Sequence, residues 1–263
     1  MKHGVLALAM VGALAACATT TSSTGRTQFV GAVSQAQLNQ LGEQAFTEAK
    51  QKGPLSTDTR QNAYVRCVVD SLVRELPAQQ RQIAWETAVF SQDEPNAFAL
   101  PGGKVGVNSG LFSVARNQDQ LAAVIAHEIG HVVENHHDER ITRQMGAAGA
   151  VQLLGSLAGN YGQAAAQGGS VLAQTGFLLP GSRAQETEAD IVGQRLMASA
   201  GYDPRGAVSL WQNMIAAGGN RPPQWLSTHP DPQSRIGELQ ARAEQLMPTF
   251  EQARAAGRRP SCG

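Results

Sequence analysis

Ala126-His127-Glu128-Ile129-Gly130-His131 is the stretch of this 263-residue sequence around which we expect the fold to be organised. Histidines four residues apart lie one turn apart on the same face of a helix, so both imidazole rings can reach a single ion. Glu128 stands between them, where its carboxylate can take a proton from a metal-bound water. This pattern is typical of zinc hydrolases. The alternative for so short a motif is a helix whose histidines only pack or form hydrogen bonds.

The residues on both sides of this stretch, from 118 to 137, are compatible with a helix. Apolar side chains recur at helical spacing along it, namely Leu121, Ile125, Ile129 and Val132. His127 and His131 flank this apolar stripe, which predicts a half-buried helix with its ligands at the lip of a cleft. His136 and His137 do not continue the histidine face, so we expect them to be surface or packing residues.

A catalytic zinc ion needs three protein ligands and one open position for water, so one ligand remains to be found. Glu186 is the predicted third ligand, because Asp190 follows it by four residues on the same helix face. Asp190 could then bind the far nitrogen of a ligand histidine and fix its orientation. Glu188 is the competing ligand, although it points to a different face from Asp190. Without the histidine pair, these three acidic residues would be interpreted as a solvated helix face.

Taken together, several motifs resemble peptidase family M48 of the gluzincins over roughly residues 30 to 245. They are His127-Glu128-x-x-His131, Asn96-Ala-Phe-Ala-Leu-Pro-Gly-Gly103, Ser182-Arg183 followed by Glu186-x-x-x-Asp190, and Thr228-His229-Pro230 with Arg235. The lipoprotein-like branch of periplasmic quality-control proteases is more similar than the CAAX-processing or multi-span branches, because their transmembrane helices are missing here. The resemblance implies that Glu186 is the third zinc ligand.

The resemblance also implies that His229 lies near the metal. This residue is the only histidine outside the first residues and the metal helix, and it follows a loop that could fold over the cleft. As a donor it could stabilise the oxyanion of the tetrahedral intermediate. As a neutral imidazole it could instead occupy the fourth zinc position and hold the enzyme latent. A purely structural histidine that caps the last helix is the third interpretation.

The first residues resemble an export signal, with a charged start and an apolar run from Gly4 to Ala16. That run is too short for a membrane span, which needs about 20 residues. Leu14-Ala15-Ala16-Cys17 resembles a bacterial lipobox, so residues 1–16 are expected to be cut off and Cys17 to carry a lipid such as palmitate. An ordinary signal peptide is the alternative. Residues 17–30 are predicted to be a flexible tether.

Because Ala18 rather than Asp follows the cysteine, the usual sorting rule implies the outer membrane, with the protein facing the periplasm. Without Lys2, 20 of the 21 basic residues remain against 21 acidic ones, so we expect no nucleic-acid partner. Residues 31–250 are predicted to form one domain, with a C-terminal tail at 251–263. Cys67 and Cys262 are predicted to form a disulfide in this oxidising compartment; two free thiols are the alternative.

The expected fold class is α+β: a mainly helical zincin-like domain with a small antiparallel β-sheet beside the metal helix. Residues 145–176 are rich in Gly, Ala, Gln and Ser, and we interpret them as one or two helices around a mobile loop that covers the cleft. The predicted helices are 34–52, 57–76, 184–200, 204–217 and 234–246, with a short helical turn at 110–115, and the predicted strands are 83–90, 96–100 and 104–108.

These expectations combine into a mechanism with one zinc ion per chain. Zinc held by His127, His131 and Glu186 would activate a water molecule, with Glu128 as the base. The strand Asn96, Ala97, Phe98 and Ala99 could pair its backbone with an extended peptide, which favours broad cleavage of unfolded or misfolded envelope proteins.

Two other functions remain open. One is an outer-membrane chaperone or assembly factor whose zinc site only restrains a loop, with outer-membrane assembly partners. The other is hydrolysis of a small amide or ester, which the glycine-rich segment and the strand suit less well.

Overall fold

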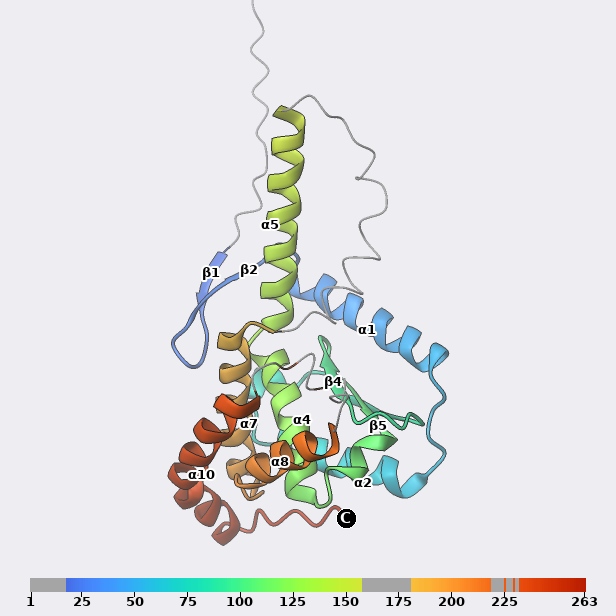
Figure 1. The fold of residues 1–263 in the computed structure, drawn as a ribbon, viewed down its shortest axis with the longest axis vertical. Helices are drawn as coiled ribbons and strands as arrows, with labels where there is room; N and C mark the ends of the chain where they lie inside the picture. Colours follow the sequence, from blue (N-terminus) through green and yellow to red (C-terminus); the bar gives the residue numbers. More distant parts are fainter. Residues whose placement is uncertain (1–17, 158–180, 219–224, 226–228, 230–231) are drawn as a thin grey trace, which may run out of the picture.

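A computed structural model describes residues 18–157, 181–218, 225, 229 and 232–263. Helix α4 (Gln118–Val133) runs through the middle of the body, between a small sheet and the helices of the C-terminal half (Figure 1). It packs against α2 (Thr59–Val73), α7 (Arg183–Ala200) and α8 (Gly206–Gly218), and against strand β4 of the sheet. The α+β class with mainly helical content is therefore confirmed.

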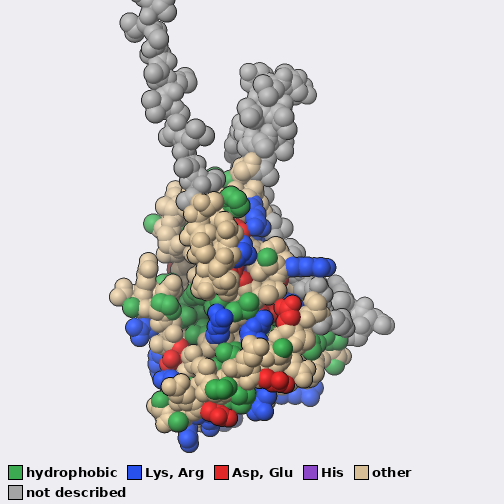
Figure 2. Space-filling view, turned by 90° about the vertical axis from the view of Figure 1, so that its left-hand side faces the viewer, with side chains coloured by type: hydrophobic (Ala, Val, Ile, Leu, Met, Phe, Trp, Pro, Cys, Tyr) green, Lys and Arg blue, Asp and Glu red, His purple; other side chains and the backbone are tan. Residues whose placement is uncertain are grey.

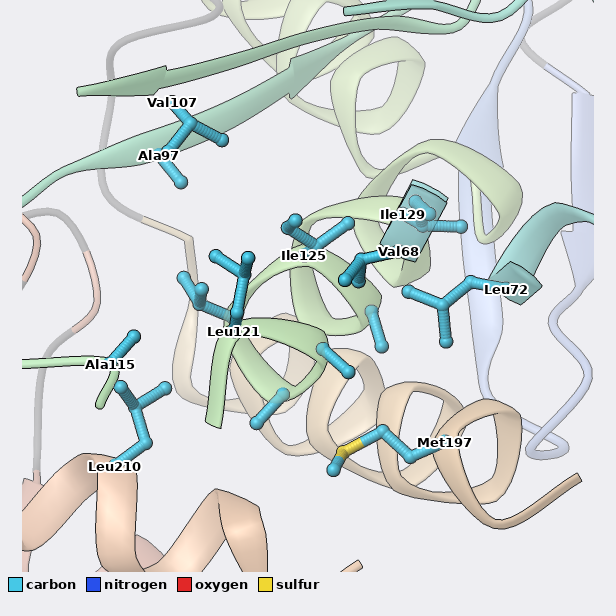
Figure 3. Packing of buried hydrophobic residues seen from close by; sticks show 14 of the residues in the cluster. Val68, Leu72, Ala97, Val107, Ala115, Leu121, Ile125, Ile129, Met197 and Leu210 are labelled. Atoms are coloured by element: carbon cyan, nitrogen blue, oxygen red, sulfur yellow. The ribbon is translucent and has the colours of Figure 1, made fainter. Parts of the chain in front are cut away.

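Helix α4 begins at an Asn117 cap, whose side chain accepts a hydrogen bond from the Gln120 backbone N–H. Three residues of its apolar stripe, Leu121, Ile125 and Ile129, are completely buried and lie in the core shown in Figure 3, while Val132 is partly buried. The helix is buried on its other faces too, because the next elements surround it. The metal helix is thus part of the core and not a half-buried surface helix.

The helix ends earlier than 137. Asn135 adopts a left-handed backbone conformation with φ of 55°, and a new helix, α5 (His136–Leu157), begins directly after it. Asparagine tolerates this conformation because its short polar side chain can bond locally. The chain therefore changes direction between His131 and His136.

The sheet consists of β3 (Glu86–Phe90), β4 (Ala97–Leu100) and β5 (Lys104–Asn108), in the order β3-β5-β4. Strands β4 and β5 form the expected antiparallel hairpin, joined by a turn whose Gly102 and Gly103 have φ of 80° and 76°. The pairing of β3 with β5 is parallel, which corrects the prediction of a wholly antiparallel sheet. The cause is that β4 occupies the far edge, so that β5 returns beside β3 in the same direction.

Two hydrophobic clusters hold the sheet between helices. One face joins the main core, and the other packs on Phe46 of α1 (Gln35–Lys52). Because successive strand residues point to opposite faces, Val89 and Phe90 lie in different clusters. The short elements α3 (Ala78–Arg81) and η1 (Ser109–Ser113) complete this half of the body.

Helices α4 and α7 approach closely because glycines stand at their crossing. A Cβ atom built on Gly130 would lie 3.0 Å from the Ala189 carbonyl oxygen. One built on Gly193 would lie 2.9 Å from the His127 backbone nitrogen. Any side chain at either position would push the two helices apart.

The chain begins its described part as a hairpin of β1 (Ala18–Thr21) and β2 (Thr27–Val30). The prediction of a flexible tether at 17–30 is therefore wrong for residues 18–30. Small polar residues of the turn reach carboxylates of the body: Ser23 donates to Glu134 from its backbone N–H (2.9 Å) and its hydroxyl (2.6 Å). Composition could not show that these polar side chains have partners far along the chain.

Helix α5 extends away from the body in Figure 1, beyond its first turns, which lie beside β2. It is one continuous helix to Leu157, so the glycines at 146, 149 and 155 do not interrupt it, and this part of the chain does not lie over the body. The remainder of the predicted cover, 158–176, lies outside the described residues. In the described part of the chain, we find no helix with the length and apolar character of a membrane span.

The C-terminal helix α10 (Pro232–Ala255) packs on α7 and α8 and is longer than predicted. The first five residues of the predicted tail, 251–255, therefore belong to this helix. A disulfide joins Cys67 of α2 to Cys262, with 5.5 Å between the Cα atoms. On the face drawn in Figure 2, acidic and basic side chains are interspersed, so no large field of one sign covers it.

Candidate metal centre

Four buried side chains bring donor atoms together at one point: His127, His131, Glu186 and His229. One atom from each lies within 4.8 Å of all the others. The Nε2 atoms of His127 and His131 are 3.1 Å apart, and each lies about as close to Glu186, at 3.4 Å and 3.5 Å from its carboxylate oxygens. The three residues predicted as ligands are thus assembled with a fourth candidate, His229.

Two helices supply the predicted ligands. The histidines come from the last two turns of α4, and Glu186 comes from the first turn of α7, which Ser182 caps. The glycine crossing of Gly130 and Gly193 brings these turns together, so the position of Glu186 depends on the closeness of two helices.

The donor set fits a cation. The Oε1 atom of Glu186 is buried and has no hydrogen-bond partner within the described part of the chain. Burial raises the pKa of Glu186, but His229, His127 and Arg235 lower it more, to about 2, so the carboxylate is ionised. An unpaired buried carboxylate oxygen that faces imidazole nitrogens is an arrangement that a divalent metal ion would satisfy.

The protonation of the two α4 histidines differs. Burial lowers the pKa of His131 well below its ordinary value, so its ring is neutral. Burial also lowers the pKa of His127, but the Asp190 and Glu186 carboxylates outweigh it and raise the pKa to about 9. A proton and a metal ion therefore compete for the Nε2 atom of His127.

Asp190 lies where the sequence placed it, with its Oδ1 atom 3.0 Å from Nδ1 of His127. Arg235 holds this carboxylate with two hydrogen bonds of 2.7 Å, and it donates a third, of 3.1 Å, to Glu186. The guanidinium also lies over the Trp211 ring, 4.2 Å from its centroid. One arginine thus fixes the carboxylates on both sides of His127.

Glu128 is buried beside the donor cluster. The Trp225 indole N–H donates to its Oε1 atom (3.0 Å), and Nε2 of His229 lies 3.2 Å from the same oxygen. Burial raises the pKa of Glu128, but its contacts with His229 and the neighbouring His127 outweigh this and lower it. The carboxylate is therefore ionised and able to accept a proton.

His229 makes contacts that suit either of its predicted roles. Its Nδ1 atom lies 2.9 Å from the Trp225 carbonyl oxygen and therefore donates a proton to it. A neutral ring then presents a lone pair at Nε2, as a metal ligand requires. A doubly protonated ring would donate from Nε2 toward Glu128, as an oxyanion stabiliser requires. The ring is buried, and its role stays a prediction.

Glu188 does not join the cluster. Its carboxylate turns toward His136, whose Nε2 atom lies 2.9 Å from Oε2. His136 is itself completely buried and contacts His131, so the expected surface position is wrong, while the packing position is right for His136 and His137. Asn135 was the sequence signal for the end of α4 before His136, because asparagine often stands where a helix ends.

The predicted substrate strand, Asn96 to Ala99, largely coincides with β4. This strand lies at an edge of the sheet, pairs with β5 and packs beside α4. Ala97 and Ala99 are buried toward the main core, while Phe98 packs on the opposite side. Its role in substrate binding stays a prediction. Cys17 lies outside the described residues.

Comparisons with known proteins agree with a metallopeptidase site. A model of Peptidase family M48 matches residues 59–243. The mitochondrial metalloendopeptidase OMA1 of Schizosaccharomyces pombe is 40% identical over 167 residues, which cover 60% of this chain and 46% of the relative. The beta-barrel assembly-enhancing protease of Escherichia coli K12 is 30% identical over 242 residues, which cover 88% and 48%. The chain spans about half the length of these curated relatives.

Proposed function

The chain belongs to peptidase family M48, a family of metalloproteases, and we propose on this premise that it is a zinc endopeptidase for unfolded or misfolded proteins of the bacterial cell envelope. One observation carries the proposal: an ionised, buried Glu128 is held beside four converging metal-donor atoms. A purely structural metal site has no need of such a carboxylate.

The residues divide the work of peptide hydrolysis. His127, His131 and Glu186 would hold the zinc ion, which would lower the pKa of a water molecule to about 7 and polarise the scissile carbonyl. Glu128 accepts a proton from the attacking water molecule and passes it to the leaving amine. Trp225 fixes the direction of the Glu128 carboxylate, and its N–H must remain in place while the proton moves.

The substrate class follows from β4. An edge strand binds an extended peptide through its backbone, which makes recognition nearly independent of the peptide's side chains. The strand runs beside α4, so a peptide paired with it would pass along the same helix that carries Glu128. Unfolded chains present such extended backbone, whereas most folded proteins do not.

The proposed location is the outer membrane, facing the periplasm, with a lipid anchor on Cys17. The sequence Leu14-Ala15-Ala16-Cys17 supports it, as does the similarity to bacterial proteins named for β-barrel assembly. Relatives named mitochondrial metalloendopeptidases share the family, so similarity alone supports the peptidase more strongly than the compartment.

The test compares the purified protein with Glu128→Gln in digestion of an unfolded protein such as casein, with zinc content measured on both. We expect the variant to keep its zinc and to lose about 10²–10⁴-fold in rate. Glu48→Gln is the matched control, because this partly exposed residue of α1 pairs with Lys52, outside the candidate site, and its replacement should leave the rate unchanged. Measurable cleavage at the same rate by wild type and by Glu128→Gln would refute the proposal.

A second function is favoured by the name of the bacterial relatives, which links them to β-barrel assembly. The chain could assist assembly with its metal site acting as a latch, and His229 in the fourth ligand position. If neither protein cuts although both hold zinc, His229→Ala should be tested for release of activity. A zinc-loaded His229→Ala that is also inactive would favour the assembly function.

A further inference from the structure

The metal-ligand candidate His131 is connected to the N-terminal hairpin by a chain of buried contacts. Its Nδ1 atom lies 2.8 Å from Nδ1 of His136, and Nε2 of His136 lies 2.9 Å from the Glu188 carboxylate. Arg26 of the hairpin turn donates from Nε to the same oxygen of Glu188 (2.8 Å). Thr24 donates to the other oxygen of that carboxylate.

The proton positions along this chain follow from the ends. If Nε2 of His131 is to bind a metal ion, its proton must sit on Nδ1 and be donated to His136. His136 then accepts at Nδ1, so its own proton sits on Nε2 and is donated to Glu188. The carboxylate can only accept while ionised, and Arg26 supplies the opposite charge. With one tautomer of His131 and one of His136, every hydrogen bond along this chain of contacts therefore has a donor and an acceptor.

The other ligand histidine is supported in a parallel way. His127 contacts the Asp190 carboxylate, and Arg235 holds that carboxylate. Each ligand histidine is therefore linked to a carboxylate that an arginine neutralises. The link is direct for His127 and runs through His136 for His131. For His127 the arginine comes from α10, whereas for His131 it comes from a turn more than a hundred residues earlier.

We propose that His136, Glu188 and Arg26 are positioning residues for His131, so that the affinity of the site for zinc depends on the docked N-terminal hairpin. Partners of this kind fix the tautomer and direction of a ligand imidazole, and losing one typically weakens metal binding 10- to 100-fold. The inference rests on the proposed metal site and adds a control point to it, outside the predicted ligand and base residues.

Two further carboxylates of the body, Glu134 and Glu139, also bind the hairpin. Arg26 spans two of them, with hydrogen bonds of 2.9 Å and 2.8 Å to Glu139 in addition to Glu188. Ser23 is bound to Glu134 through both its backbone and its hydroxyl. Movement of the segment that joins this turn to residue 17 would therefore act on Glu188 and, through His136, on the ligand.

The test measures zinc affinity by chelator competition and ligand geometry by the absorption spectrum of the cobalt-substituted protein. His136→Phe removes the relay while filling its space, and Arg26→Ala removes only its outer end. We expect His136→Phe to weaken zinc binding 10- to 100-fold and Arg26→Ala to weaken it several-fold, each with a changed cobalt spectrum. The double variant should bind like His136→Phe alone, because Arg26 acts through His136.

Glu188→Gln is the conservative variant, since its amide oxygen can still accept from His136, and it should retain more affinity than Glu188→Ala. Arg205→Ala is the matched control, because this exposed arginine pairs only locally with Asp203, and its affinity should be that of wild type. Strictly additive losses in the double variant, or affinities within two-fold of wild type for folded Arg26→Ala and Glu188→Ala, would overturn the proposal. If wild type and His229→Ala both bind zinc and neither cleaves casein, the proposed endopeptidase activity is refuted and this inference stays intact.

Discussion

Replacing Gly193 by alanine should loosen the metal centre by forcing α7 away from α4. The added Cβ would lie 2.9 Å from the His127 backbone nitrogen, some 0.5 Å short of ordinary contact, and the obstacle is backbone that cannot rotate away. Glu186 stands two turns earlier on the same face of α7, so the displacement carries this ligand away from the histidines.

The magnitude combines two opposing effects. Alanine is favoured over glycine inside a helix by about 0.5–1 kcal/mol, whereas overpacking a well-packed contact costs about 1–3 kcal/mol. We expect Gly193→Ala to be destabilised by about 1–2 kcal/mol, or about 2–8 °C in Tm, and to bind zinc more weakly. Urea and thermal unfolding, together with chelator competition, measure both effects.

Gly237→Ala is the matched control, because this exposed glycine of α10 has nothing within 4 Å of a built Cβ. The free energy of unfolding of Gly237→Ala should rise by about 0.5–1 kcal/mol, and its zinc affinity should be unchanged. The reasoning would be refuted if Gly193→Ala were as stable as Gly237→Ala and bound zinc like the wild type.

Three further predictions concern stability. Arg235→Met should cost about 3–5 kcal/mol in urea unfolding, because it removes the arginine that pairs with the buried Asp190 and Glu186 carboxylates. Burial raises the pKa of Glu139, but Arg26 and other hydrogen bonds outweigh it and lower the pKa below 4.5, so this group stabilises the fold above that pH and loses its effect below it. The stability advantage of wild type over Glu139→Gln should therefore shrink in urea unfolding as the pH falls below 4.5. Cys67→Ser should cost about 2–4 kcal/mol, and a reductant should bring the wild type to the same midpoint.

The sequence was most informative where chemistry follows from spacing on one helix. The pair His127 and His131 needs only the helical repeat to converge, and Glu186 with Asp190 needs only the same repeat on a second helix. The hairpin of β4 and β5 could be predicted for a similar reason, because its turn residues and alternating side chains lie close together in the sequence. Ser34, where the first predicted helix begins, is likewise the cap of α1.

What could not be predicted depends on contacts between distant parts of the chain. His136 looked like a surface residue because an uninterrupted helix would carry it off the ligand face, and the left-handed Asn135 redirects it. The turn at residues 22–26 looked like a tether because its polar residues find partners more than a hundred positions later. The parallel pairing of β3 and β5 likewise depends on which strand takes the edge.

The contact of Arg235 with Asp190 and Glu186 has a consequence for biosynthesis. Before residue 235 has been made, a nascent chain already contains both histidines and both carboxylates, but it lacks the arginine that pairs with Asp190 and Glu186. Burying these carboxylates without that counterion is costly, so α7 should pack less stably on α4. We expect the proposed protease to become active only after its last helix has been made, so an unfinished chain should not cleave the unfolded polypeptides around it.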